Sequence, residues 1–232
     1  MAAIVWDSIG THFYETGSDH AVLYVQDANG AYPKGVAWNG LTQVSENPDG
    51  AEPTDIYADN IKYAVLRSAE TFGCTIEAYT YPDEFMQCDG SASIADGVYV
   101  GQQLRKAFGF CYRTLIGSDT APASDQTYKI HLVYNATAAP SDKQYQTVND
   151  NPDAITMSWE VRTTALTVPG YSPMSTITID STKVDADKLA SFLDIIYGAE
   201  NTEARLPLPA EVIEHFSEDE TPGETQTPGE GN

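Results

Sequence analysis

The residue types that most often carry chemistry are sparse or scattered in this sequence. The four histidines form no HExxH motif and no other paired spacing of the kind that binds zinc; they are His12, His20, His131 and His215. The chain also lacks a GxSxG nucleophile motif, a P-loop and a glycine-rich dinucleotide loop. We therefore expect no metal, no cofactor and no nucleophilic catalysis.

Carboxylates are abundant, with 34 Asp and Glu residues, so some pairs are bound to lie close together. Glycoside hydrolysis needs two carboxyl groups about 5 to 9.5 Å apart in a cleft. Sugar-binding clefts usually carry clustered tryptophans, whereas Trp6, Trp38 and Trp159 are far apart in the sequence. No loop follows the DxDxDG pattern of a calcium site. We predict that the protein is not an enzyme.

The charge balance limits the partners. The formal net charge is −22, with only 12 Lys and Arg residues. Binding to nucleic acid needs cations that displace counterions, and an anionic membrane leaflet repels such a surface. The charge is explained either by solubility alone or, more specifically, by a surface that nucleic acid must pass without binding. No membrane association is expected.

Cysteine usage and the N-terminus predict a cytosolic origin. Cys74, Cys88 and Cys111 are odd in number and widely spaced, and two of them have apolar neighbours, which favours buried free thiols. The N-terminal residues show no basic region followed by an apolar run, so no signal peptide is predicted.

Alternating patterns predict a mainly β fold. Strands with one apolar and one polar face are expected at 70–81, 105–116, 128–135, 154–163 and 175–180. Glu77 and Glu160 fall on polar faces, as does His131, which we expect at the surface. Residues 21–26 and 35–39 flank an Asp-Ala-Asn-Gly turn and predict a hairpin. The strands together predict a sandwich or barrel.

Three other segments complete the expected organisation. One helix is predicted after Asp185, which can cap it, and before Gly198, which can end it. Residues 43–60 are predicted to form a long acidic loop with Ile56 and Tyr57 as apolar anchors that dock onto another surface. The domain is expected to span 1–213, and residues 214–232, which include a repeated Thr-Pro-Gly-Glu, to form a disordered acidic tail. That tail is either a solvent-facing end or a linker to a further domain.

Several runs of the sequence resemble the major tail protein family of long-tailed, non-contractile bacteriophages. They are GVAWNGL at 35–41, GAEPT at 50–54, YADNIKY at 57–63, TIEAYTYPDEF at 75–85, CDG at 88–90, KIHLVY at 129–134 and ARLPLP at 204–209. The resemblance covers about residues 4 to 213 and leaves out the acidic tail.

The resemblance implies a tail tube protein, a β-sandwich with one flanking helix that forms hexameric rings stacked into a hollow tube. The subunits would complete an inner β-barrel around the lumen, through which DNA passes at ejection. Implied partners are further copies of the chain, a tape measure protein, and tail terminator and distal tail proteins. The implied location is the virion tail, after assembly in the host cytoplasm.

Within that picture, six residues are candidates for particular roles. Trp6, Trp38, Ile56 and Tyr57 are the candidate contacts between subunits or rings. Glu77 and Glu160 are the candidate lumen charges, because an acidic wall repels phosphate. An inner tube protein of a contractile injection system and an immunoglobulin-like binding module remain as alternatives.

Overall fold

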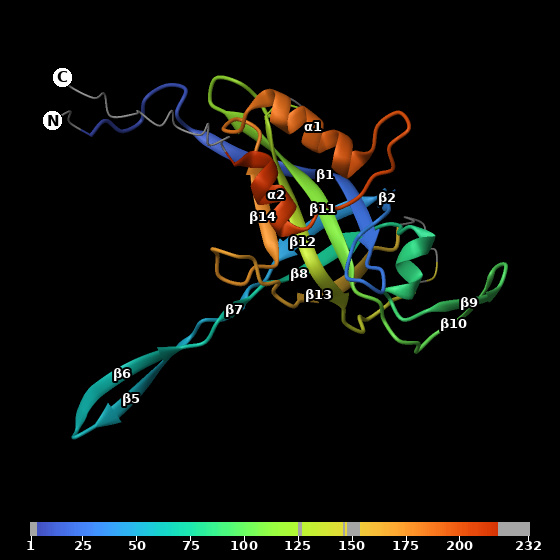
Figure 1. The fold of residues 1–232 in the computed structure, drawn as a ribbon, viewed down its shortest axis with the longest axis horizontal. Coiled ribbons are helices and arrows are strands. Elements are labelled where there is room, and N and C mark those ends of the chain that lie inside the picture. The colour runs from blue at the N-terminus through green and yellow to red at the C-terminus, as the bar shows by residue number, and fades with distance from the viewer. Residues whose placement is uncertain (1–3, 125–126, 146, 148–153, 218–232) are drawn as a thin grey trace, which may run out of the picture.

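The fold is known from a computed structural model that describes residues 4–124, 127–145, 147 and 154–217 (Figure 1). Its main sheet has eight strands in the order β2-β1-β11-β12-β13-β8-β3, with β14 paired to β12. The bounds are β1 (Phe13–Val25), β2 (Gly35–Ala37), β3 (Leu41–Glu46), β8 (Gly73–Ala78), β11 (Phe108–Ser118), β12 (Tyr128–Ala138), β13 (Met157–Thr163) and β14 (Thr176–Asp180). All of these pairings are antiparallel.

The sheet divides at β12. Residues 129–133 of this strand pair with β14, whereas residues 136–138 pair with β13 on the same side. The division lets β13, β8 and β3 turn away from β14, so that two layers form as in a sandwich. The prediction of a mainly β, sandwich-like fold is therefore confirmed, and the described strands do not close into a barrel.

One core lies between the curved strands. It is built around Trp38, Phe85 and Trp159, whose rings meet edge to face or tilted with centroids 4.5 to 5.6 Å apart. Such aromatic pairs contribute beyond the area that they bury. The short 3₁₀ helix η1 (Asp83–Gln87) supplies Phe85.

A second core lies under two helices. α1 (Ala186–Tyr197) contributes Leu189, Phe192 and Ile196, which pack with buried residues of β1, β11 and β12. Figure 1 shows α1 and α2 (Pro209–Phe216) together on one side of the sheet. One flanking helix was predicted, and α2 corrects that number to two. Pro209 suits a first helical position, and Val212 is buried. Because α2 extends to Phe216, the first residues of the tail predicted over 214–232 are helical; residues 218–232 lie outside the described part of the chain.

The three cysteines are free and buried, as predicted. Burial raises the pKa of each thiol to about 12, so the thiolate, which is the reactive form, is scarce at neutral pH. The predicted β1–β2 hairpin is also present. Its turn is held by Asp27, whose Oδ1 accepts hydrogen bonds from the backbone of Asn29 (2.8 Å) and Ala31 (2.9 Å).

The cap of α1 gives a testable stability effect. Asp185 Oδ1 accepts hydrogen bonds from the backbone N–H groups of Asp187 and Lys188, both at 3.0 Å. Asp185→Ala should lower the free energy of unfolding by about 1 kcal/mol, measured by urea denaturation, because these donors lose their partner. Asp194→Ala removes the same charge from an exposed position in the same helix and serves as the control. Equal effects in the two variants would contradict the capping role.

Candidate assembly surfaces

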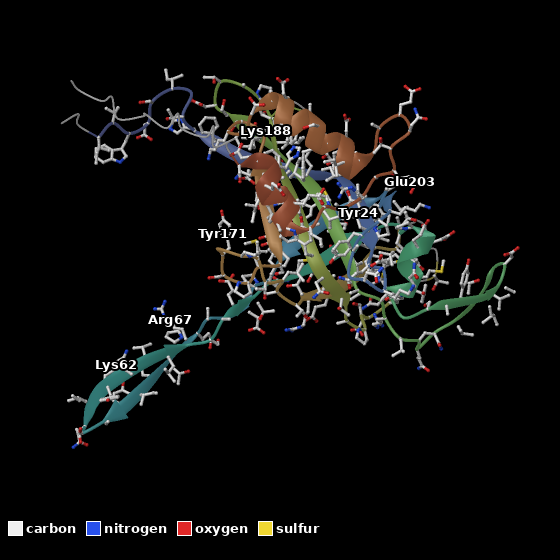
Figure 2. The ribbon with its side chains drawn as sticks, in the orientation of Figure 1. Tyr24, Lys62, Arg67, Tyr171, Lys188 and Glu203 are labelled. Atoms are coloured by element: carbon white, nitrogen blue, oxygen red, sulfur yellow. The ribbon has the colours of Figure 1, made fainter. Side chains whose placement is uncertain are left out.

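A long β-hairpin projects from the body where the sequence predicted a loop. It comprises β4 (Asp49–Gly50), β5 (Pro53–Ala58), β6 (Ile61–Arg67) and β7 (Glu70–Thr71), and we call residues 49–71 the arm. Figure 1 shows the arm extending far from the sheet, and Figure 2 shows Lys62 and Arg67 along it. The predicted loop over 43–60 is therefore wrong: its residues form β3 and the first half of this hairpin.

The tip of the arm explains why a hairpin forms here. Asp59 and Asn60 both have positive φ, 52° and 63°, as the two central residues of a type I′ turn require. The flanking strands carry β-branched and aromatic residues, which favour extended backbone. Asp55 and Lys62 form an ion pair of 2.7 Å near the tip. The Asp-Asn pair between two such runs was the sequence signal for this turn.

The arm exposes an unusual amount of apolar surface. Its exposed large apolar residues are Ile56, Tyr57, Ile61, Tyr63, Val65 and Leu66, with Tyr63 at 72%. Both strands pair only with each other, so the outer edge of each lacks a strand partner among the described residues. A two-stranded hairpin alone is at best marginally stable in water. The predicted anchors Ile56 and Tyr57 thus lie at the surface, with four further apolar residues that sequence reasoning missed.

The N-terminal segment, residues 4–14, is the second projecting apolar element. Trp6 is 74% exposed, and Ile4, Val5, Ile9 and Phe13 are exposed as well. The segment is fastened by Asp119, whose carboxylate oxygens lie 3.0 and 3.1 Å from the backbone nitrogen of Gly10. His12 Nδ1 lies 3.3 Å from the same carboxylate. Trp6 is therefore accessible for contacts between subunits.

The third projecting element is the hairpin of β9 (Ala92–Ala95) and β10 (Val98–Val100). It exposes Ile94, Val98 and Tyr99. Its base is held by the buried carboxylate of Asp89, which lies 2.5 Å from Lys143 Nζ and 3.5 Å from Arg105 Nη1. Burial acts to lower the pKa of Lys143, but the hydrogen bond and charge of Asp89 outweigh it and raise that pKa.

Trp38 lies in a different environment from Trp6. It is 2% exposed, and its indole N–H donates to the backbone oxygen of Thr80 at 2.9 Å. In this fold it has no surface to offer to a neighbouring subunit. The prediction of Trp38 as an assembly contact is therefore wrong, because the apolar run around it pairs with β1 and closes the first core.

The two candidate lumen residues lie on one solvent-facing side of β3, β8 and β13, which we call the polar face. It consists of Gln43, Ser45, Thr75, Glu77, Ser158, Glu160 and Arg162, which alternate with core residues. Glu77 is half-buried and Glu160 is exposed. Arg162 Nη2 lies 2.8 Å from Glu160 Oε1 and its Nη1 lies 3.4 Å from Asp49 at the arm's root. The hydrogen bond to Glu160 raises the pKa of Arg162. Arg162 therefore stays positively charged, and the polar face carries this cation beside the carboxylates of Glu77 and Glu160.

His131 is not the surface residue that the alternation predicted. Its ring stacks on Tyr112, with centroids 4.6 Å apart and an angle of 10° between the planes. Its nitrogens lie 3.0 Å from Thr114 Oγ1 and 3.4 Å from Thr178 Oγ1. The difference arises because β11 and β14 flank β12 in the sheet and place Tyr112 and Thr178 directly beside His131.

Comparisons with known proteins add little to this geometry. No protein-family model matches the chain, and no curated protein matches it. A cryo-electron microscopy structure of the anti-feeding prophage baseplate, six-fold symmetrised, is similar at a TM-score of 0.33 and 7% identity, covering 76% of this chain and 97% of that chain. A likeness this weak assigns neither a fold nor a function.

Within the described ranges, no group of three or more His, Cys, Asp or Glu side chains is placed to hold a metal ion. Neither of the two α-helices in the described part of the chain has the length and apolar character of a membrane span.

The anchor of the N-terminal segment should depend on pH. The hydrogen bond from Gly10, with that of His12, holds the pKa of Asp119 below its ordinary value of 3.8. A lowered carboxyl pKa means that the anchor is complete above pH 3.8 and is lost as the pH falls through the folded-state pKa. We expect the Gly10 amide signal in NMR to titrate with a midpoint below 3.8, and this titration to vanish in Asp119→Asn. A midpoint at or above 3.8 would contradict the contact.

Proposed function

We propose that this chain is a self-assembling structural subunit of a tail tube, which forms rings that stack into a hollow cylinder. The observation that carries the proposal is the arm with its exposed apolar side chains. The resemblance of the sequence to phage major tail proteins supports the same function. The proposal includes the expectation that the chain has no catalytic activity.

The arm supports assembly for an energetic reason. Full burial of one large apolar side chain stabilises a folded or assembled state by about 1.5–3 kcal/mol. The arm has six such side chains that remain exposed within the single chain. The N-terminal segment and the β9–β10 hairpin add two more such surfaces at other places on the molecule. Exposed apolar patches of this kind mark sites of protein interaction. A surface on one side that fits a different surface elsewhere gives head-to-tail contacts, which build rings or stacks.

Further copies of the chain are the partner that this distribution favours. Strand edges that lack a strand partner among the described residues, on the arm and at β3, can pair with edges of neighbouring copies. Pairing of this kind would complete the predicted inner barrel. A tape measure protein inside the tube, terminator and distal tail proteins at its ends, and a location in the virion tail follow from the resemblance and are part of the proposal.

The polar face is the proposed wall of the lumen. Glu77 and Glu160 would make that wall repel phosphate, so that DNA passes without binding. A cryo-electron microscopy map of an assembled tube tests this placement. We expect both carboxylates to point toward the interior. A map with the polar face on the outer surface of the tube would refute the placement.

Loss of the arm's apolar contacts should abolish stacking. We expect the double substitution Ile56→Ala and Tyr57→Ala to give rings or monomers in place of tubes in negative-stain electron microscopy. Both side chains are solvent-exposed, so the fold itself should be kept, which circular dichroism can verify. Tyr171→Ala removes another exposed tyrosine, from the body instead of the arm, and is the matched control.

Two results would count against the proposal. Tubes of normal length from the double variant would remove the arm from the assembly role. A wild-type protein that stays monomeric at high concentration would instead favour the alternative of a binding module, which needs no self-association.

A further inference from the structure

The root of the arm is connected to the interior of the sheet by a chain of three side chains. Glu46 is the last residue of β3 before the arm begins. Its Oε1 accepts a hydrogen bond of 2.7 Å from the hydroxyl of Tyr112 on β11. Tyr112 in turn stacks on His131 of β12. Three strands and the arm's root are thus linked through one phenol and one imidazole.

A small cavity lies beside this connection. Its volume is about 190 Å³, and its lining includes Glu46, Pro48, Glu70 and Phe72 from the arm's root as well as Tyr112 and His131 from the sheet. The root itself is held by few backbone bonds. They include Asn47 N to Gly73 O at 2.7 Å and the pairing of Asp49 with Thr71. A change in the protonation of His131 therefore acts next to the root of the arm, which few backbone hydrogen bonds hold to the sheet.

We propose that the stack of His131 on Tyr112, bonded through the Tyr112 hydroxyl to Glu46, is a pH-sensitive latch that fixes the root of the arm on the sheet. This latch does not depend on the proposed assembly function. It concerns the attachment of the arm within a single chain.

The hydrogen bonds around His131 suit a neutral imidazole. The Thr114 hydroxyl donates to Glu15, at 3.3 Å, and so accepts from the N–H at Nε2 of His131. Nδ1 is then an acceptor for the hydroxyl of Thr178. Protonation at Nδ1 turns it into a donor, and the Thr178 hydroxyl must reorient.

The charged groups that face His131 do not cancel the effect of burial on its pKa. They are Glu46 from β3, Glu15 from β1, Lys129 from β12 and Glu70 from β7 across the cavity, while β11 and β14 contribute the uncharged Tyr112 and Thr178. Burial lowers the pKa of His131 below 6.5, and Lys129 adds to this, against the opposing effect of Glu46 and Glu15. Burial also raises the pKa of Tyr112, so its hydroxyl stays a donor.

The sign of the pH effect follows from linkage. Because the folded state favours neutral His131, its contribution is complete above pH 6.5 and is lost progressively as the pH falls from there through the folded-state pKa. Acidification should therefore loosen the root of the arm before it unfolds the body.

The test is residue-resolved hydrogen exchange on the full chain between pH 8 and pH 5. Protection factors divide out the intrinsic pH dependence of exchange. We expect the protection of the Asn47 amide to fall on acidification, while that of the Leu189 amide, which donates to Asp185 in α1, stays constant. The NMR titration midpoint of His131 should lie below 6.5. A constant Asn47 protection, or a midpoint at or above 6.5, would overturn the proposal.

Two variants separate the latch from general destabilisation. In His131→Gln, the ratio of Asn47 protection between pH 8 and pH 5 should drop to about one, because the titrating group is gone. In Tyr112→Phe the stack remains but the bond to Glu46 is lost, so His131 should still titrate while the Asn47 amide no longer follows it. A wild-type pH response of the root in either variant would show that the latch does not act through these residues.

Discussion

The structure depends on two strands, β11 and β12, that are buried on both faces. Phe108, Phe110 and Tyr112 of β11 face the first core, while Cys111 faces the second core under the helices. Strands of this kind fix the register of their neighbours, since a shift by one residue would move every side chain to the wrong face. Arg113 strengthens the register with β1 by a bidentate contact to Asp19 of 2.7 and 2.8 Å. The hydrogen bonds from Arg113 keep the pKa of Asp19 low.

This well-packed centre contrasts with the periphery. The body buries its apolar side chains in two cores, yet the arm, the N-terminal segment and the β9–β10 hairpin each expose several. Each of these elements is anchored by a specific polar contact at its base, such as Asp119 for the N-terminal segment and Asp89 for the β9–β10 hairpin. Fixed bases hold the apolar ends in defined directions, which lowers the entropic cost of binding a partner. This arrangement suits a protein that completes its hydrophobic contacts in an assembly.

Periodicity in the sequence was sufficient to predict most of the body. Alternation located β8 and β13, and the Asp185 cap and Gly198 end located α1. The polar composition of residues 43–60 predicts a loop, but Asp59 and Asn60 form a tight turn that lets the flanking strands β5 and β6 pair as an arm. The sequence did not predict the second helix because its last residues fall within 214–232, where acidic composition predicted a tail, although Val212 faces the second core.

The sequence by itself determined the mainly β class, the buried thiols and the alternation of most strands, because these depend on residue types and local spacing. Only the tertiary structure decided which apolar residues are covered. Trp38 and Trp6 have similar sequence surroundings, yet one is buried and the other exposed, because burial depends on strands distant in the chain. The environment of His131 was likewise set by β14, which pairs with β12 from more than 40 residues away, as the hydrogen bond between Thr178 and His131 records.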